Sequence, residues 1–373
     1  MSPQETRQPA RVERLAGELP GLELDALLVD SLVNVRYLTG FTGSNAVALV
    51  LAGKAVGHSG HHRFLTDSRY TTQAAEQVSV EFERQIAAGE LLEALGGLLA
   101  EGGGRLGFDE ASVTVKTHRH LRELLPESWE LVGCSGAVER LRAVKEPAEI
   151  ECLRAASQLA DEALREVLQR GLAGRSERDV ALDLELRMRQ LGAESPSFPS
   201  IVAAGAHGAL PHAEPREQTI PRNVLVTIDW GAVLDGYCSD CTRTYATGEA
   251  ISTQAREVYE LVLDAQQRGL AAVQAGRSGP EVDAVARAVI EAGGHGENFG
   301  HGLGHGVGME VHEAPRVSRT ASDEPLVAGN VVTIEPGIYL PGQLGVRIED
   351  LVVVREGTQA VLTSLSKELT VVG

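Results

Sequence analysis

Short apolar runs and amphipathic segments alternate along the first part of the chain. Three apolar runs have the length of β-strands: DALLV (25–29), AVALVL (46–51) and RFLTD (63–67). The segments TTQAAEQ (71–77) and KTHRHLRELL (116–125) are typical of helices. Because strands and helices that alternate in this way build α/β folds, the pattern predicts one α/β domain over residues 1–143.

A long helix is predicted at the start of the second part of the chain. Pro147 suits the first turn of a helix, since the N–H that proline lacks is not needed there. Apolar or small side chains then recur at helical spacing: Ile150, Leu153, Ser157, Ala160, Leu164 and Leu168. We place the domain junction just before this helix, so residues 144–373 are expected to form a second domain.

The start of a helix is repeated within the second domain. The tripeptide Gly-Arg-Ser at 174–176 recurs at 276–278. Each copy opens an amphipathic segment that a glycine ends, Gly192 in the first and Gly293 in the second. The apolar faces expected on the two helices are Val180, Leu184, Met188 and Leu191, and Val282, Val285, Val289 and Ile290.

A strand pattern repeats in the same order. The sequence VTIDWG at 226–231 resembles VTIEPG at 332–337, and each predicts a strand whose last residue before a turn is a carboxylate. A histidine, His212 or His312, lies between each helix and its strand. A helix, a histidine and an acid-tipped strand, twice over, imply two related halves that face each other and pool their carboxylates.

Length and charge limit the classes of function. A chain of 373 residues agrees with two domains, and the formal net charge of −18 argues against nucleic acid, whose binding needs basic patches. Four cysteines are too few for a disulfide framework, and no apolar run approaches the ~20 residues that span a bilayer. These observations predict a cytoplasmic protein that binds neither nucleic acid nor membrane.

Four acidic residues lie in or beside Val/Ile-rich strands of the second domain. Asp229 ends the run NVLVTID, and Glu335 ends VVTIE. Asp240 lies in the apparent hairpin arm that follows, and Glu349 lies within GVRIEDLVVV, which we expect to be one partner strand. Acids in such strands are at least partly buried, and four of them together would repel one another unless cations lie between them. A pair of divalent cations would supply this charge.

His305 adds a nitrogen ligand from the glycine-rich segment FGHGLGHGVGMEVHE. His301 and His305 have the spacing of helical zinc sites, but the glycines around them make a helix improbable, since each costs about 1 kcal/mol relative to Ala. We expect an irregular backbone that passes close to a ligand. Carboxylates with one histidine suit Mn²⁺, Co²⁺, Fe²⁺ or Zn²⁺, and two such ions can activate water and polarise a carbonyl, which predicts hydrolysis.

Four segments together resemble the pita-bread metallopeptidases, specifically prolidase and aminopeptidase P: DWGAVLDGYCSDCTRT, HGLGHGVGMEVHE, TIEPGIYL and VRIEDLVVV. The segments NVRYLTGFTGSNA, FLTDSRYTTQAAEQ and SFPSIVAAGAHGALPHAEP are similar to the same family, so the resemblance covers nearly the whole chain. It implies an α/β protein of two domains, a smaller α/β amino-terminal domain and a carboxy-terminal pita-bread catalytic domain of duplicated α+β structure. It also implies a homodimer.

The resemblance implies a role for each residue of the metal site. Asp229 and Asp240 would hold one ion. The ligands of the other ion would be Asp240, His305, Glu335 and Glu349. Asp240 and Glu349 would bridge the two ions, and Glu335 would also act as the general base. Two divalent ions per chain are expected, with Mn²⁺ favoured over Co²⁺, Zn²⁺ and Fe²⁺.

The same resemblance implies residues that contact the substrate. His212 and His312 would flank it, binding the scissile carbonyl or steadying the tetrahedral intermediate. His301 matches a histidine near the pocket for the substrate proline, and Arg347 matches an arginine beside the site. Tyr339 aligns with a nearby tyrosine.

The predicted activity is hydrolysis of the bond between a residue and a following proline. This bond is a tertiary amide without an N–H, so the strand-like binding that ordinary proteases use fails. A prolidase-like dipeptidase that releases proline from Xaa-Pro dipeptides is favoured because the chain is compact, and an aminopeptidase P acting on longer peptides is the alternative. An inactive peptide-binding module on the same fold is disfavoured because all five metal-site residues are present.

A dipeptidase must either block the space beyond the proline or bind its free carboxylate with a cation. The sequence offers four candidates for this cation: Arg36, Arg69, His207 and Arg347. Their spacing alone does not indicate which of them faces the site.

The cysteines Cys238 and Cys241 straddle Asp240 in a CxxC pattern. This pattern is also found in redox pairs and in halves of zinc sites. Because no second cysteine pair exists, we expect two buried small side chains instead.

Two patterns in the first domain also have ordinary explanations. His58, His61 and His62 lack an accompanying acid pattern, which favours a surface loop over a metal site. Asp67 and Arg69 fit equally well as structural caps and as the border of the substrate entrance.

Overall fold

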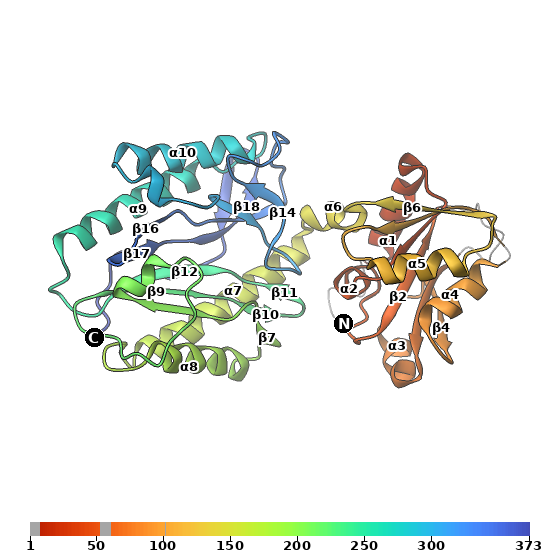
Figure 1. The fold of residues 1–373 in the computed structure, drawn as a ribbon, viewed down its shortest axis with the longest axis horizontal. Helices are drawn as coiled ribbons and strands as arrows, with labels where there is room; N and C mark the ends of the chain where they lie inside the picture. The colour runs from red at the N-terminus through yellow and green to blue at the C-terminus, as the bar shows by residue number, and fades with distance from the viewer. Residues whose placement is uncertain (1–7, 53–60, 101) are drawn as a thin grey trace. The chain divides into compact units, whose positions relative to one another are not determined.

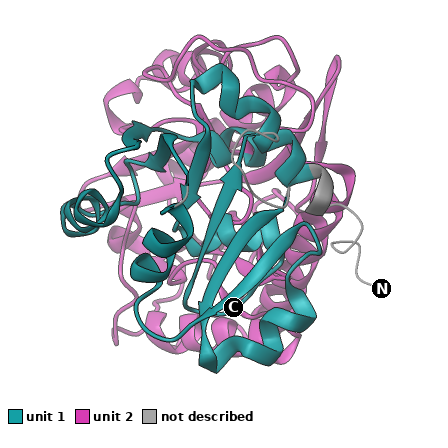
Figure 2. Cartoon of the chain, turned by 90° about the vertical axis from the view of Figure 1, so that its right-hand side faces the viewer, with its two compact units in different colours: residues 1–142 teal, residues 143–373 magenta. Residues whose placement is uncertain are grey.

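The computed structural model describes residues 8–52, 61–100 and 102–373. The chain divides into two units, residues 1–142 and residues 143–373, which Figure 2 shows in different colours. Among the described residues, no helix is both long and apolar enough to cross a membrane.

The amino-terminal unit is a mixed sheet with helices. Its strands are β1 (Ala26–Val29), β2 (Ala46–Leu51), β3 (His62–Asp67), β4 (Phe82–Ala87), β5 (Gly104–Asp109) and β6 (Trp129–Cys134). Its helices are α1 (Gln8–Glu18), α2 (Leu32–Thr39), α3 (Thr71–Gln77), α4 (Leu91–Leu99), α5 (Val115–Leu124) and α6 (Ala137–Ala143). The strand order is β4-β3-β2-β1-β5-β6, and β1 is parallel to β5 but antiparallel to β2. Every residue of β1 and β2 is buried, as expected for strands covered on both faces.

All five elements predicted for this unit are confirmed, with ends that agree to within a residue. One prediction is wrong, because His62 does not lie in a surface loop. It begins β3, is buried, and its Nδ1 accepts a hydrogen bond of 3.1 Å from the Leu51 N–H. His61 is exposed, and His58 lies outside the described residues. Asp67 caps a short 3₁₀ turn by accepting from the Arg69 N–H, which fits the interpretation as a structural cap.

Four long helices belong to the second unit: α7 (Pro147–Leu168), α8 (Glu177–Gln190), α9 (Thr253–Ala272) and α10 (Gly279–Ala292). The three predicted helices are confirmed as α7, α8 and α10. Ser176 caps α8 by accepting from the Asp179 N–H at 3.0 Å, and Ser278 forms a capping box with Glu281 at α10. Figure 1 shows α9 and α10 on one side of the strands of this unit, with α7 and α8 on the other.

The strands of the second unit form four small sheets. A three-stranded sheet consists of β8 (Ile201–Ala204), β9 (Leu225–Trp230) and β12 (Cys241–Ala246). A five-stranded sheet consists of β13 (Gly304–Gly306), β14 (Glu313–Val317), β15 (Val331–Ile334), β18 (Asp350–Arg355) and β19 (Thr358–Val361). The remaining strands are β7 (Ser195–Pro196), β10 (Ala232–Leu234) and β11 (Tyr237–Cys238) in one sheet, and β16 (Gly337–Leu340) and β17 (Leu344–Arg347) in another.

The two repeated strands occupy corresponding places. The first, β9, is antiparallel to β12, and the second, β15, is antiparallel to β18. The halves are joined by a backbone hydrogen bond of 3.1 Å from the Glu349 N–H to the Thr242 carbonyl. The repeated halves therefore meet at the segments that carry Asp240 and Glu349.

The strand predicted over 345–354 is interrupted, which corrects the expectation of one continuous partner strand. Ile348 and Glu349 lie between β17, which pairs with β16, and β18, which pairs with β15. Glu335 lies at the matching break between β15 and β16. It is followed by Pro336, which has no N–H and cannot continue the ladder. Both glutamates therefore lie where the paired strands pass from one sheet to the other.

His305 lies in a short strand, β13, where we expected an irregular backbone. A side chain at Gly304 would place its Cβ 1.9 Å from the Thr333 carbonyl oxygen, and one at Gly306 would lie 2.3 Å from that of Ala314. The glycines therefore allow neighbouring strands to approach closely. The register shifts between His305 and Gly306, so the strand is regular only over this short stretch.

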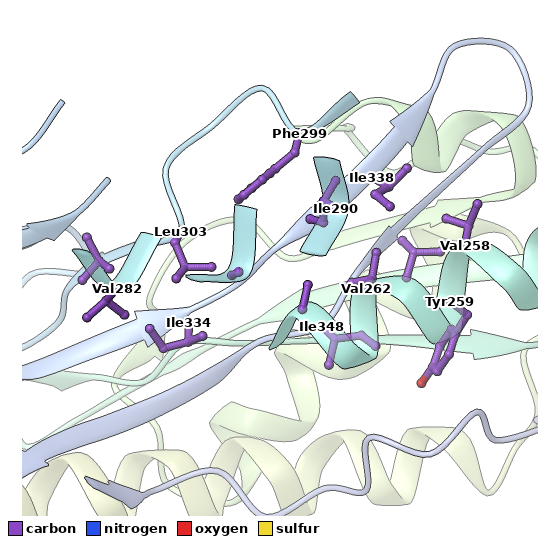
Figure 3. Close-up of a cluster of buried hydrophobic side chains, with 14 of the residues drawn as sticks. Val258, Tyr259, Val262, Val282, Ile290, Phe299, Leu303, Ile334, Ile338 and Ile348 are labelled. Atoms are coloured by element: carbon purple, nitrogen blue, oxygen red, sulfur yellow. The ribbon is translucent and has the colours of Figure 1, made fainter. Parts of the chain in front are cut away.

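An apolar core lies between α9, α10 and the strands of the second half. Figure 3 shows Val258 and Val262 of α9 in one apolar cluster with Ile290 of α10. On the predicted face of α10, Val282 and Ile290 are fully buried. Ile334 and Ile348 enter the same core and so fix the two strand breaks described above.

Candidate metal centre

The direction in which the acidic side chains point follows from the alternation of side chains along an extended backbone. Ile228, Ile334 and Ile348 are completely buried in apolar clusters. Each directly precedes one of the predicted acids: Asp229, Glu335 and Glu349. Because successive side chains point to opposite sides, an inward isoleucine turns the following carboxylate away from the apolar core. Asp240 lies between β11 and β12 and is 4% exposed.

Four of the five predicted metal-site residues come together around His305. Ligand atoms of Asp240, His305 and Glu349 lie within 4.8 Å of one another. The Nε2 atom of His305 is 3.6 Å from Oδ2 of Asp240 and 3.3 Å from Oε1 of Glu335. Residues from both halves of the unit therefore meet at one point.

Asp229 lies beside this group. Its charge acts on the pKa of Asp240 and of Glu349, and its Oδ2 accepts a hydrogen bond of 2.6 Å from Nη2 of Arg347. Its Oδ1 is buried and has no hydrogen-bond partner among the residues that the structure describes. A buried carboxylate oxygen without a partner is costly, and a cation would satisfy it.

The carboxylates of this site are buried close together, where their negative charges repel one another. Burial, and then repulsion from neighbouring carboxylates, raises the pKa of Asp240 and of Glu349 well above the usual range. Burial also raises the pKa of Asp229, although Arg347 opposes the change. Oxygen donors that resist ionisation together are the donors a divalent cation would stabilise, so the residues fit such an ion.

The ring of His305 is oriented for a ligand at Nε2. Its Nδ1 lies 3.1 Å from the Gly306 carbonyl oxygen, which can only accept, so Nδ1 donates. The other nitrogen, Nε2, faces the carboxylates. Histidines that bind metals usually hold the second ring nitrogen in this way.

Thr242, which the sequence analysis did not single out, supports two site residues. Its hydroxyl donates to Oε2 of Glu349 at 2.7 Å and accepts from Nε of Arg347 at 3.0 Å. Thr242 follows Asp240 by two residues, and strand alternation would have placed both side chains on one face.

Arg243 is a buried cation behind the site. Its guanidinium donates to the carbonyl oxygen of Glu349, to Oδ1 of Asp350 at 2.8 Å and to the carbonyl oxygen of Leu365 at 2.8 Å. Lys367 donates to the other oxygen of Asp350. The segment that carries Glu349 is thereby tied to residues near the end of the chain.

His212 and His312 both have exposed side chains. The His312 ring lies 4.2 Å from that of His305, centroid to centroid. Burial, and then the charge of His305, lowers the pKa of His312, and His212 acts in the same direction. The two histidines are thus close enough to influence each other. A cavity of ≈ 440 Å³, lined in part by Val233 and Met309, opens beside His312.

His301, Tyr339 and Arg347 form one directed chain of hydrogen bonds. Burial lowers the pKa of His301 and favours the neutral ring, so with Nδ1 donating to the Gly302 carbonyl at 2.8 Å, Nε2 accepts from the Tyr339 hydroxyl at 2.9 Å. The Tyr339 oxygen in turn accepts from Nη1 of Arg347 at 2.9 Å. Since Arg347 also holds Asp229, the chain reaches from the predicted proline pocket to the metal-site residues.

Cys238 and Cys241 are buried, as predicted. Cys241 Sγ lies 3.5 Å from the Glu349 carbonyl oxygen. Burial raises the pKa of the Cys241 thiol well above its usual value, which disfavours a thiolate ligand.

Among the candidates for the cation that binds the substrate carboxylate, His207 is already engaged. It is buried, and its Nδ1 lies 2.9 Å from Glu177. Arg69 forms an ion pair with Asp67 at 2.9 Å. An arginine that the sequence analysis missed, Arg316, lies directly opposite His305 in the β13–β14 pair.

Two family models match this chain. Residues 151–356 match the model described as metallopeptidase family M24, and residues 11–144 match the creatinase/prolidase amino-terminal domain. The chain belongs to metallopeptidase family M24. The resemblance to the pita-bread peptidases, and the expected pairing of an α/β amino-terminal domain with a pita-bread catalytic domain, are thereby confirmed.

Relatives of this M24 chain cover nearly its full length. A solved Xaa-Pro dipeptidase from Bacillus anthracis is 39% identical with a TM-score of 0.92, covering 98% of this chain and 99% of that one. A Pyrococcus horikoshii protein named Xaa-Pro dipeptidase is 33% identical over 96% of this chain and 98% of its own length. A solved X-Pro aminopeptidase from Thermotoga maritima is 36% identical with a TM-score of 0.87, covering 97% of this chain and all of that one.

The raised carboxyl pKa values of this M24 chain predict that metal stabilises it more at higher pH. A carboxyl whose pKa is raised by folding contributes stability below its unfolded pKa and loses it as the pH rises through the folded pKa. For Asp240 and Glu349 this loss runs from the ordinary carboxyl range up to their raised pKa values. We expect Mn²⁺ to raise the melting temperature of chelated protein by several degrees more at about pH 7 than at about pH 5. Calorimetry at both pH values measures this difference, and equal increases would contradict it.

Proposed function

We propose that this M24 peptidase is a prolidase-like dipeptidase, which hydrolyses the Xaa-Pro bond with two divalent metal ions and releases proline. The observation that carries the proposal is the convergence of donor residues from both halves, in a chain whose full-length relatives include proteins named Xaa-Pro dipeptidase. The proposed metal ligands are Asp229, Asp240, His305, Glu335 and Glu349.

We assign Asp229 and Asp240 to one ion, and Asp240 with His305, Glu335 and Glu349 to the other. Asp240 and Glu349 would be shared by both ions, and the burial and carboxylate repulsion that raise their pKa values make a nearby cation favourable. The bound ions would polarise the scissile carbonyl and lower the pKa of the attacking water. A donor set of oxygens with one imidazole favours Mn²⁺, and metal analysis of unchelated protein would identify the native ion.

Glu335 is the proposed general base. Burial by itself would raise its pKa, but the hydrogen bond and charge of His305, with His301 and Arg347, lower it to about 2. Its carboxylate is therefore ionised at neutral pH and able to accept a proton. Thr333 donates to Oε1 of Glu335 at 3.2 Å and so restrains the side chain.

His212 and His312 are proposed to hold the scissile carbonyl oxygen. The lowered pKa of His312 keeps its imidazole neutral, with one N–H available as a donor. Such a donor stabilises the charge that develops on the carbonyl oxygen in the tetrahedral state. The side chains of His301 and Tyr339 are hydrogen-bonded to each other. We therefore propose that they form a rigid surface beside the substrate proline.

Arg316 is the proposed partner of the free carboxylate of a dipeptide. Directly opposite residues of antiparallel strands carry their side chains on the same face, so Arg316 shares the face of His305. Its charge contributes to the lowered pKa of His312, which supports its proximity to the site. A cation beside the site would bind the free carboxylate of the proline in a dipeptide. In a longer peptide the proline has no free carboxylate, so the same cation would distinguish the two substrates.

The proposal predicts that Mn²⁺-loaded protein hydrolyses Ala-Pro but leaves Ala-Pro-Ala intact. Replacing Arg316 by alanine is expected to raise the KM for Ala-Pro roughly tenfold or more, because a charge-assisted hydrogen bond is worth about 1.5–3 kcal/mol. Chromatography of the released proline measures both rates. The exposed Arg319 provides a control, since Arg319→Ala should leave the KM unchanged.

Turnover of the tripeptide would favour the alternative, an aminopeptidase P that removes the first residue of longer Xaa-Pro peptides. The relative from Thermotoga maritima named X-Pro aminopeptidase supports this second candidate. An unchanged KM in Arg316→Ala would assign the carboxylate to another group.

We also propose a domain junction between residues 143 and 144, and a cytoplasmic homodimer. The division of the chain after Arg142 supports this junction. The small number of cysteines, four in 373 residues, fits a reducing compartment. Sedimentation of the purified protein and fractionation of cells would test the oligomeric state and the location.

A further inference from the structure

The segment that carries His212 connects β8 to β9. It starts with a 3₁₀ turn, Gly205–Ala209, and then passes His212 on its way to Arg216. Beneath this segment lies Glu177, the first residue of α8, whose side chain is 1% exposed. None of the catalytic roles proposed above uses this buried carboxylate.

Glu177 is saturated with donors from both ends of the segment. At the near end, it accepts from the Ala204 N–H at 2.9 Å and from Nδ1 of His207 at 2.9 Å. At the far end, it accepts from the N–H of Arg216 at 3.1 Å and from Nε and Nη2 of its side chain at 3.1 and 3.2 Å. One carboxylate therefore holds both ends of the segment together.

The middle of the same segment is held by contacts with residues of β17. The Pro211 carbonyl, next to His212, accepts from Nη1 of Arg347 at 3.2 Å. Gly208 packs against Gly345 so closely that a Cβ on Gly345 would lie 1.8 Å from the Gly208 carbonyl oxygen. With its ends on Glu177 and its middle on Arg347, the segment leaves His212 little freedom of position.

We infer that Glu177 is a positioning residue for the reaction, which fixes the 204–216 segment so that His212 meets the scissile carbonyl. This inference rests on the role proposed for His212. The hydrogen bonds of Glu177 go to Ala204, His207 and Arg216, so its effect on the reaction would pass through His212. An error of about 1 Å in such a group can cost a hundredfold in rate, so the anchoring matters for kcat.

The test is a double-mutant cycle. Glu177→Gln places an amide NH₂ among donors, so we expect it to lower kcat for Ala-Pro about tenfold or more, with a smaller change in KM. In a His212→Ala background the same substitution should have no further effect on kcat, because residues that act through one another are not additive. Asp183→Asn is the matched control, since Asp183 lies on the same helix but pairs with Arg170 and Arg175 and should leave kcat unchanged.

A second measurement does not depend on turnover. In chelated protein, Glu177→Gln should increase hydrogen–deuterium exchange of the 204–216 amides, while Asp183→Asn should not. If Glu177→Gln does not fold, Arg216→Ala releases only the far end, from a residue whose side chain is 44% exposed. Losses in kcat that multiply in the double variant, or unchanged exchange in this segment, would overturn the inference. Absence of Xaa-Pro turnover in the wild-type protein would instead overturn the proposed function, and the exchange experiment would still test the anchoring.

Discussion

Replacing Glu335 by alanine is expected to reduce hydrolysis of Ala-Pro to background, a loss of roughly a thousandfold or more. Glu335 is assigned as both ligand and base, so its removal deletes two contributions at once. Its carboxylate lies 3.3 Å from Nε2 of His305, and its pKa of about 2 keeps it ionised where the other three acids resist ionisation.

The measurement is kcat and KM for Ala-Pro with saturating Mn²⁺, together with the metal content of the variant. Glu324→Ala provides a control, because Glu324 is exposed in the loop before β15 and should keep full activity. If Glu335→Ala retains more than about a tenth of the wild-type kcat, the general base lies elsewhere.

Removing the metals is expected to have an effect of similar size. Chelation should abolish hydrolysis of Ala-Pro, and Mn²⁺ should restore it. Asp240 is assigned to both ions and is 4% exposed, so its oxygens have no alternative contact with water. Asp240→Ala should therefore lower the bound metal from two ions per chain to one or none, and turnover to background.

Metal analysis by mass spectrometry and titration calorimetry would give the stoichiometry. Asp264→Ala is a suitable comparison, since this residue is 45% exposed on α9. Wild-type protein that binds no divalent ion, or an Asp240→Ala variant that still binds two, would contradict the binuclear assignment.

Local patterns in the sequence were sufficient to predict most of the helices and strands. Apolar spacing located α7, α8 and α10, and the repeated strand motif located β9 and β15. The break between β17 and β18 was not predicted, because GVRIEDLVVV is uniformly strand-like. Its interruption depends on tertiary pairing, since β17 forms a hairpin with β16 whereas β18 pairs with β15 in another sheet.

The same distinction applies to the site. Asp229 and Glu335 could be predicted because each ends a repeated motif. The contributions of Thr242, Arg243 and Glu177 depend on contacts with residues far away in sequence, which no local pattern reveals. His62 was predicted wrongly because a histidine in a polar-looking segment gives no local sign that strands flank it on both sides.

The network behind Glu349 has a consequence for synthesis of the protein. Arg243 and Asp350 are both buried and form an ion pair. Arg243 donates to the carbonyl of Leu365, and Asp350 accepts from the ammonium of Lys367. A ribosome makes all the metal-site residues before it makes these two partners. A nascent chain in which residue 367 is not yet free to fold therefore contains every proposed metal ligand. It still lacks the contacts that hold the backbone of Glu349 in place. We expect peptidase competence to arise late in translation, after this segment emerges.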